Sequence, residues 1–342
     1  MRSAMVRGSA APSLVDKNIK LFDKCRSHLK KNYFDLLVVR EVGIGDVADC
    51  AIVCRAIARK YPEARIKFCT SSNMVSYLKR FDWIGEAVSS TSSILQSLRN
   101  CCDLLIDLRG IIDFLPWCNK KPRMDLFAMM AGVQLQKGDL RYRFVPANEE
   151  RDFAKRIFQT YTTGKRKLIA VPKCAAPIRT WDCMLEFVDE MSSEFDVYLV
   201  DAAPLGFEGK GIYDLGGKLN ICELTGLLYE SDVVVTPDTG VMHLAGWMGV
   251  PFVSIFGPIL PEFRVGHFSN HIDLYLRDLE CSPCWDWQRG ACDVDPRLRG
   301  KTDVSHHWIG GQKIVRVYKQ CLKNITVDMV KDAVRKLAGE SK

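Results

Sequence analysis

The sequence lacks any apolar run long enough for a membrane-spanning helix. Such a helix needs ~20 consecutive apolar residues, and every apolar run in these 342 residues is much shorter. The first residues also lack the continuous apolar core of a secretory signal. We therefore expect a cytoplasmic chain without a transmembrane segment. Its net charge of +7 leaves peripheral association with an anionic membrane surface open.

A concentrated basic segment is missing too. The 48 lysines and arginines are spread along the chain and interleaved with 41 acidic residues, whereas nucleic-acid-binding chains gather positive charge into patches or tails. We expect no nucleic-acid partner, and the dispersed surplus of positive charge indicates some attraction for anionic substrates.

Cysteine, in contrast, is plentiful, with 14 residues. Without an export signal these are expected to be free thiols or metal ligands in a reducing compartment. The chain is too long for one ordinary core and suits two domains. Its hydrophobic content of 47% and charged content of 26% are typical of a folded protein.

The most informative stretch runs from Asp232 to Pro258 and reads DVVVTPDTGVMHLAGWMGVPFVSIFGP. Its pattern predicts a strand, a turn, a helix and a second buried strand. The turn, Asp238 to His243, follows a strand and precedes a helix, where backbone N–H groups attract phosphate. The alternative interpretation is an Asx turn with a capping aspartate and a histidine satisfied in the core.

This string resembles the C-terminal donor-site signature of glycosyltransferase family nine, the bacterial heptosyltransferases. The residues that match are Asp238, Thr239, Gly240, His243, Leu244, Ala245, Gly249, Pro251, Phe256, Gly257 and Pro258. The resemblance implies a nucleotide-sugar site in which Thr239, Gly240 and His243 surround the diphosphate. Asp238 would then bind a hydroxyl of the donor sugar.

A second motif follows the first predicted strand, Phe34 to Arg40. Gly43-x-Gly45 lacks the third glycine of a dinucleotide-binding loop, which excludes that reading. What remains is Asp46 on a glycine turn before a helix from Val47 to about Lys60, where an aspartate often serves as N-cap. The string VVREVGIGD resembles the N-terminal signature of the same family, and this resemblance implies that Asp46 is the general base.

Strand and helix patterns alternate through both halves of the chain, which predicts an α/β fold. We expect an N-terminal acceptor-side domain over residues 1–150, with a linker near Pro146 to Arg151, and a donor-binding domain over 151–342. The resemblance implies the GT-B fold, two Rossmann-like domains facing a central cleft. It also implies that the amphipathic last helix, Thr326 to Leu337, returns toward the first domain.

The loop VPKCAAPIRTW resembles the donor loop of the family, in which a lysine stands two residues before a tryptophan. Here Arg179 occupies that position before Trp181, and a guanidinium can grip phosphate oxygens with two hydrogen bonds. Lys173 and Cys174 replace the small hydroxyl residues of the family.

The resemblance implies an inverting transfer of heptose from ADP-heptose to a lipopolysaccharide core sugar or to a protein hydroxyl. We expect no catalytic metal, because no Asp-x-Asp string lies near these motifs. Two alternatives stay open: a transferase that uses another nucleotide sugar, since the ribose-binding glutamate of the family has no clear match, and a non-catalytic nucleotide-sugar-binding module. A homo-oligomer is also open.

Four cysteines remain outside this scheme: Cys281, Cys284, Cys292 and Cys321. Four thiols with one C-x2-C pair suit a tetrahedral structural site for zinc or iron, and the intervening stretch from Asp286 to Gly311 reads as a polar loop. The cluster over 281–321 resembles the cysteine finger of the autotransporter-type heptosyltransferases. The alternative is four buried free thiols.

Overall fold

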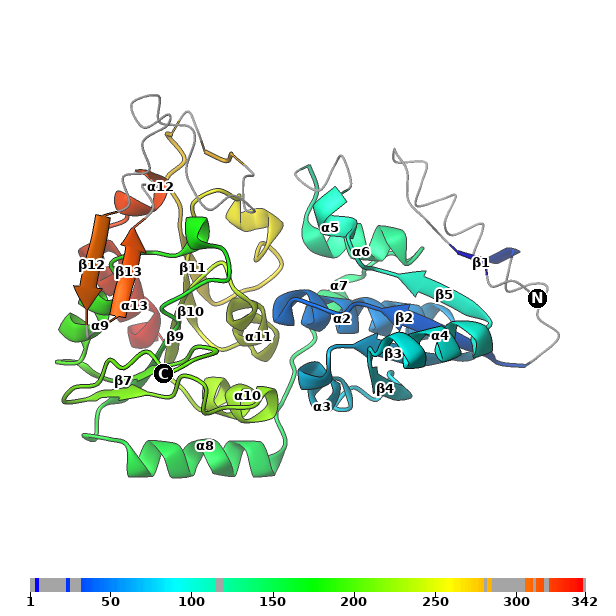
Figure 1. Cartoon of the computed structure of the whole chain (residues 1–342), viewed down its shortest axis with the longest axis horizontal. Coiled ribbons are helices and arrows are strands. Elements are labelled where there is room, and N and C mark those ends of the chain that lie inside the picture. Colours follow the sequence, from blue (N-terminus) through cyan, green and yellow to red (C-terminus); the bar gives the residue numbers. More distant parts are fainter. Residues whose placement is uncertain are drawn as a thin grey trace. The chain divides into compact units, whose positions relative to one another are not determined.

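The computed structural model describes residues 4–5, 23–24, 32–114, 120–279, 282–284, 305–309, 312–316 and 320–340. The chain forms two compact units, residues 1–142 and 143–342 (Figure 1). The division falls after Tyr142, and helix α8 (Asn148–Thr160) already begins within the segment predicted to be a linker.

Unit 1 is built on a parallel sheet with strand order β1-β5-β2-β3-β4. Its strands are β1 (Ala4–Met5), β2 (Phe34–Val39), β3 (Ala64–Thr70), β4 (Glu86–Ser89) and β5 (Leu104–Asp107). In the central strand β2, the side chains from Leu36 to Val39 have no exposed surface, as expected for a strand covered on both faces. Val39 pairs with Cys69 and with Asp107, so these strands end together at one edge.

The helices of unit 1 follow these strands in sequence. They are α2 (Ile44–Lys60), α3 (Val75–Leu78), α4 (Ser92–Cys101), α5 (Ile111–Phe114), α6 (Arg123–Met130) and α7 (Lys137–Leu140), with a 3₁₀ turn η1 (Ser72–Met74). Helix α2 is buried over most of its length because its sequence is dominated by alanine, valine, isoleucine and cysteine. It contacts β3, α6 and α7, and this packing fixes its first turn at the edge of the sheet where β2 ends.

Unit 2 contains a parallel six-stranded sheet with order β11-β10-β9-β6-β7-β8. Its strands are β6 (Arg166–Ala170), β7 (Phe195–Leu199), β8 (Ile212–Asp214), β9 (Val233–Pro237), β10 (Phe252–Ile255) and β11 (His271–Leu274). The chain continues from β6 to one side and from β9 to the other, so the two adjacent strands form a topological switch point. The loops that follow them are therefore brought together, which is where open α/β sheets bind ligands.

The helices of unit 2 are α8, α9 (Met184–Met191), α10 (Ile221–Tyr229), α11 (Gly240–Met248), α12 (Gln320–Lys323) and α13 (Val327–Glu340), with 3₁₀ turns η2 (Pro177–Arg179) and η3 (Pro261–Phe263). Apolar side chains of α9 and α13 form one buried cluster with β6, β7, β9 and β10. The last helix thus belongs to the core of unit 2.

The stretch predicted to be a polar loop before Gly311 also contains regular structure. Strand β12 (Ser305–Ile309) pairs in antiparallel fashion with β13 (Gln312–Arg316). The loop prediction was wrong at this point, because a short hairpin among polar residues leaves little hydrophobic periodicity to detect.

Candidate functional site

Asp46 is the third residue of α2, and a glycine turn shapes its surroundings. The helix begins at Ile44 after Gly43, which has φ 86° and is the N-cap residue. A Cβ atom at Gly43 would lie 2.4 Å from Oδ2 of Asp46, so only glycine lets this carboxylate fold back over the start of the helix. Interpreting Asp46 as the N-cap was therefore wrong.

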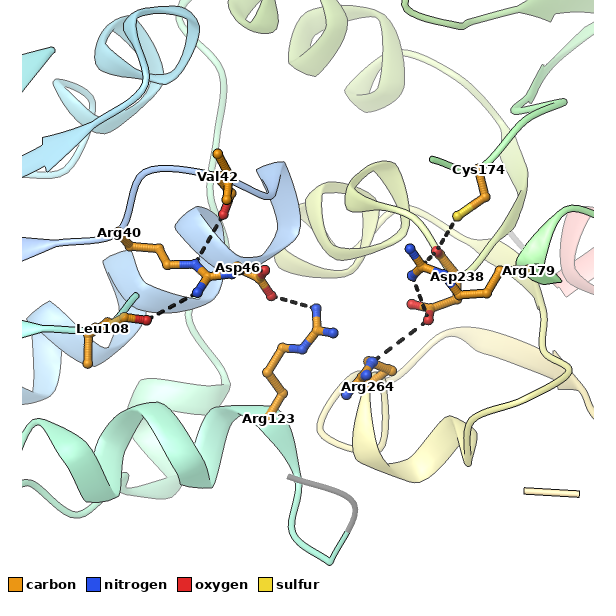
Figure 2. A network of polar contacts seen from close by, with 9 residues as sticks. All are labelled: Arg40, Val42, Asp46, Leu108, Arg123, Cys174, Arg179, Asp238 and Arg264. Atoms are coloured by element: carbon orange, nitrogen blue, oxygen red, sulfur yellow. Dashed lines mark hydrogen bonds and ion pairs between the residues drawn. The ribbon is translucent and has the colours of Figure 1, made fainter. Parts of the chain in front are cut away.

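Two arginines hold the Asp46 carboxylate (Figure 2). Arg40 Nη2 lies 2.5 Å from Oδ2, and Arg123 Nη1 lies 2.5 Å from Oδ1. Arg40 is itself fixed, because it donates to the carbonyl oxygens of Val42 and Leu108, each at 3.1 Å. Since the Asp46 side chain is only 7% exposed, these charge-assisted bonds define its position closely.

At the switch point of unit 2, Arg179 and Asp238 form an ion pair. Arg179 Nη1 donates to the Asp238 backbone oxygen at 2.9 Å and to Oδ2 at 3.0 Å (Figure 2). The Cys174 thiol donates to the same backbone oxygen at 3.3 Å. Burial raises the pKa of Cys174, which keeps the proton that this bond needs. The loop after β6 is thereby attached to the turn after β9.

The tryptophan of the same loop attaches it to the C-terminal segment. Trp181 is 1% exposed, and its Nε1 donates to the carbonyl oxygen of Ile325 at 2.9 Å. Ile325 lies two residues before the start of α13, so the C-terminal segment supports the loop that carries Arg179.

Helix α11 starts beside the Arg179–Asp238 pair. Its N-cap is Thr239, whose hydroxyl lies 2.8 Å from Thr236 Oγ1 and forms no side-chain cap bond within the described part of the chain. Thr239 and Gly240, the first helical residue, are half-buried. The first N–H groups of α11 are thus suited to an anion.

His243 occupies the same first turn, and its side chain is buried. The residue is 1% exposed, and its ring lies edge-on to Phe268 with 6.3 Å between the ring centres. Among the residues predicted to bind the donor, Arg179 and Asp238 are joined by hydrogen bonds and an ion pair. Thr239 and Gly240 follow them in the chain, whereas Asp46 belongs to unit 1.

Three arginines of these networks were missed from the sequence. Arg40 stands at the end of a strand-like apolar run, and this position is the only sequence feature that could have pointed to it. Arg123 lies 77 residues from Asp46, and Arg264 reaches Asp238 from the segment after η3, with Nε 3.8 Å from Oδ2. Contacts between residues so far apart in sequence follow from the tertiary fold and leave no local pattern.

Two of the four predicted metal ligands, Cys284 and Cys321, are described, whereas Cys281 and Cys292 lie outside the described residues. Ser282, two residues before Cys284, donates to the Gly257 carbonyl at 2.8 Å. A Cβ atom at Gly257 would lie 2.9 Å from the Cys321 sulfur. Both cysteine-bearing segments thus meet at Gly257.

In the described part of the chain, no three His, Cys, Asp or Glu side chains are grouped as metal ligands would be, and none of the described cysteines forms a disulfide. No helix among these residues has the length and apolar character needed to traverse a bilayer.

Two parallel α/β units, the second with a switch point, match solved GT-B structures, which confirms the predicted fold class. The family model "Glycosyltransferase family 9 (heptosyltransferase)" matches residues 192–291. Lipooligosaccharide heptosyltransferase 2 of Haemophilus influenzae is 36% identical over 50 residues, which are 15% of this chain and 14% of that protein.

Solved structures resemble the chain over most of its length. ADP-heptose lps heptosyltransferase II of E. coli matches with a TM-score of 0.62 and 15% identity, covering 90% of this chain and 99% of its own. A family 9 glycosyl transferase from Veillonella parvula has a TM-score of 0.65 at 14% identity, covering 90% and 98%. TibC of enterotoxigenic E. coli, an iron-containing dodecameric glycosyltransferase, has a TM-score of 0.61 at 16% identity, covering 91% and 78%. At these identities the likeness shows the fold.

Proposed function

We propose that the protein is an inverting glycosyltransferase that moves a heptose-type sugar from ADP-heptose to an acceptor hydroxyl. The observation that carries this proposal is the Arg179–Asp238 pair at the start of α11. It combines a guanidinium, open helix N–H groups and a carboxylate at the switch point, which suits a sugar diphosphate. Asp238 and α11 also lie inside the segment that the family 9 model matches.

In this proposal unit 2 binds the donor. Arg179 and the N–H groups of Thr239 and Gly240 stabilise the charge that develops on the departing diphosphate, as pre-oriented donors do in transferases. His243 lies in the same helical turn and is the last of the proposed diphosphate-binding residues. Asp238 accepts a hydrogen bond from a hydroxyl of the donor sugar.

Asp46 in unit 1 is the proposed general base. A carboxylate can take the proton of the acceptor hydroxyl while the oxygen attacks the sugar carbon from the face opposite the diphosphate. Arg40 and Arg123 hold the carboxylate in one orientation, which reduces the entropy lost when the acceptor is aligned with it.

The names of two neighbours support the proposed donor. TibC has also been solved in complex with ADP-D-beta-D-heptose, with a TM-score of 0.59 to this chain, and the E. coli structure is named ADP-heptose lps heptosyltransferase II. These neighbours support ADP-heptose as the donor. Two acceptors stay open, a lipopolysaccharide core sugar and a protein hydroxyl.

We also propose a cytoplasmic location, with which the absence of disulfides among the described cysteines agrees.

A structural metal at Cys281, Cys284, Cys292 and Cys321 is part of the proposal. The two described cysteines of this set fit a shared metal site, because the segments of Cys284 and Cys321 converge on Gly257. Four thiolates suit iron or zinc, and the iron and twelve subunits in the name of TibC favour iron and a homo-oligomer. The metal would tie the segment to the core of unit 2.

Titration calorimetry with nucleotides tests the donor site. We expect wild-type protein to bind ADP, Arg179→Ala and His243→Ala to bind it roughly 10-fold to 100-fold more weakly, as for loss of a hydrogen bond to a charged group, and Asp46→Asn to bind it normally. Unchanged affinity in both unit 2 variants would place the diphosphate elsewhere. Tighter binding of UDP or GDP than of ADP would favour a different nucleotide sugar.

A non-catalytic module would bind the nucleotide without transferring its sugar. Incubation of the same protein with ADP-heptose and candidate acceptors, followed by measurement of ADP release, separates this alternative from the proposed enzyme.

A further inference from the structure

Arg264 lies next to the Asp238 carboxylate yet belongs to none of the motifs found in the sequence. It directly follows the 3₁₀ turn η3, and its backbone N–H donates to the carbonyl oxygen of Pro261 at 2.8 Å. Two residues later, a Cβ atom at Gly266 would lie 2.7 Å from the carbonyl oxygen of Glu262. This tight turn fixes the backbone from which the Arg264 side chain extends.

The side chain of Arg264 is only 6% exposed. Arginine is rarely buried to this extent unless it meets a negative group, because removing a guanidinium from water is costly. Its Nε lies 3.8 Å from Asp238 Oδ2, a distance that is too long for a hydrogen bond. The same oxygen accepts a bond from Arg179 at 3.0 Å.

Asp238 therefore has a guanidinium on each of two sides, as Figure 2 shows. Each guanidinium carries five N–H donors, whereas a carboxylate accepts about four hydrogen bonds in all. Two arginines beside one carboxylate also give these three side chains one positive charge in excess, next to the turn that begins α11. A diphosphate carries several oxygens with negative charge and matches paired arginine forks.

We propose that Arg264 is a second cationic ligand of the donor diphosphate and that Asp238 positions both arginines for it. Arg179 and Arg264 would bind the diphosphate from two sides, with the N–H groups at the start of α11 as the third contact. This inference rests on the proposed function, since it names a further residue of the same donor site. It adds a charge that the sequence motifs do not contain.

The test compares ligands with and without the diphosphate. Full-length wild type, Arg264→Gln and Arg264→Lys are titrated with ADP, AMP, adenosine and inorganic pyrophosphate. We expect Arg264→Gln to weaken ADP and pyrophosphate roughly 10-fold to 100-fold, as for a lost charged hydrogen bond, and AMP less, with adenosine unchanged. Arg264→Lys keeps the charge without the fork and should give an intermediate loss.

The matched control is Arg277→Gln. Arg277 pairs with Glu262 in the neighbouring segment, and its side chain is 63% exposed, so its loss should leave all four affinities unchanged. Circular dichroism establishes that each variant is folded. If Arg264→Gln does not fold, Arg264→Lys decides, and a Lys variant that binds pyrophosphate as tightly as wild type would overturn the inference.

Two other results would overturn the inference as well. A folded Arg264→Gln protein with wild-type affinity for ADP and pyrophosphate would show that Arg264 only balances the charge of Asp238. An equal loss for adenosine and ADP would show a general distortion of the site. Wild-type protein that binds no nucleoside diphosphate would instead refute the proposed function, and its pyrophosphate titration would still test Arg264.

Discussion

Asp46 shows how much a single side chain depends on its neighbours. Gly43 makes room for the carboxylate, and the guanidinium groups of Arg40 and Arg123 each bind one of its oxygens. An aspartate that only stabilised the helix N-terminus would need none of these partners. This arrangement fixes the position of the carboxylate, as the proposed general base requires.

We expect Asp46→Asn to reduce sugar transfer by a factor of order 10² to 10⁴, the usual contribution of general-base catalysis. Asparagine is nearly isosteric and still fits beside Gly43, so folding and ADP affinity should change little. Initial rates of ADP release, measured at saturating donor, give the effect. A variant that transfers sugar at the wild-type rate would remove Asp46 from the mechanism.

The sequence pointed to site residues only where they lie in short, contiguous motifs. Asp46 and Asp238 each lie shortly after a buried strand and at the start of a helix, so their place at the sheet edge could be predicted. Arg123 and Arg264 come from segments whose position depends on packing, and no local spacing marks them. His243 was placed by its motif alone, and its burial against Phe268 depends on the tertiary fold.

Among the elements, the strands were the easiest to predict. The strands of both parallel sheets read as short apolar runs because helices cover both faces, and β2 matches its predicted range, Phe34 to Arg40, to within one residue. Helix α2 begins earlier than predicted, since Ile44-Gly45 reads as part of a glycine turn. The short elements α7, β8 and β12 offer too few residues for any periodic signal.

Strand β7 is held at its first residues by a buried carboxylate. Asp196 accepts hydrogen bonds from the hydroxyls of Thr162 and Thr163, at 2.7 and 2.6 Å, and from the Thr163 backbone N–H. Burial raises the pKa of Asp196, but the hydrogen bonds from Thr163 and Thr162 outweigh it and leave the pKa below its ordinary value. The charged form therefore stabilises the fold.

We expect Asp196→Asn to lower the free energy of unfolding by about 1 to 3 kcal/mol at neutral pH. Because the pKa is lower in the folded state, wild-type protein keeps this stabilisation above the ordinary Asp pKa of about 4 and loses it as the pH falls further. Urea unfolding at several pH values should show that the difference in free energy of unfolding between wild type and Asp196→Asn becomes smaller below about pH 4. Asp328→Asn, which changes an exposed residue, is the control. A difference in stability between wild type and Asp196→Asn that does not depend on pH would contradict the stabilising role of the Asp196 charge.

The cysteine-bearing segments give a prediction on metal removal. Protein made under anaerobic, metal-replete conditions should contain about one zinc or iron per chain, and chelation should lower its melting temperature, because four-thiolate sites contribute folding energy. Cys281→Ser and Cys321→Ser should lose the metal, while Cys101→Ser, which changes an exposed thiol, should keep it. Elemental analysis that finds no metal in the wild type would refute the site.

At the scale of the whole molecule, composition and strand-helix alternation were enough to predict two α/β units. The position of their division was harder to predict, because the polar stretch after Pro146 reads as a linker but provides the first turn of α8. That turn is stabilised by Glu150, whose carboxylate accepts the Ala147 N–H at 2.9 Å. Sequence order also leaves the order of strands in space undetermined, and that order creates the switch point.

The packing of α13 has a consequence for the order in which the protein is made. Strands β6, β7, β9 and β10 share a buried cluster with α13, and the loop of Arg179 is anchored to Ile325 through Trp181. Trp181 and Ile325 are separated by 144 residues, and domains generally fold in order from the N-terminus. Unit 1 can therefore fold before Ile325 has left the ribosome, whereas the loop of Arg179 gains its support only after α13 has emerged. Nascent chains that lack α13 should therefore not bind ADP.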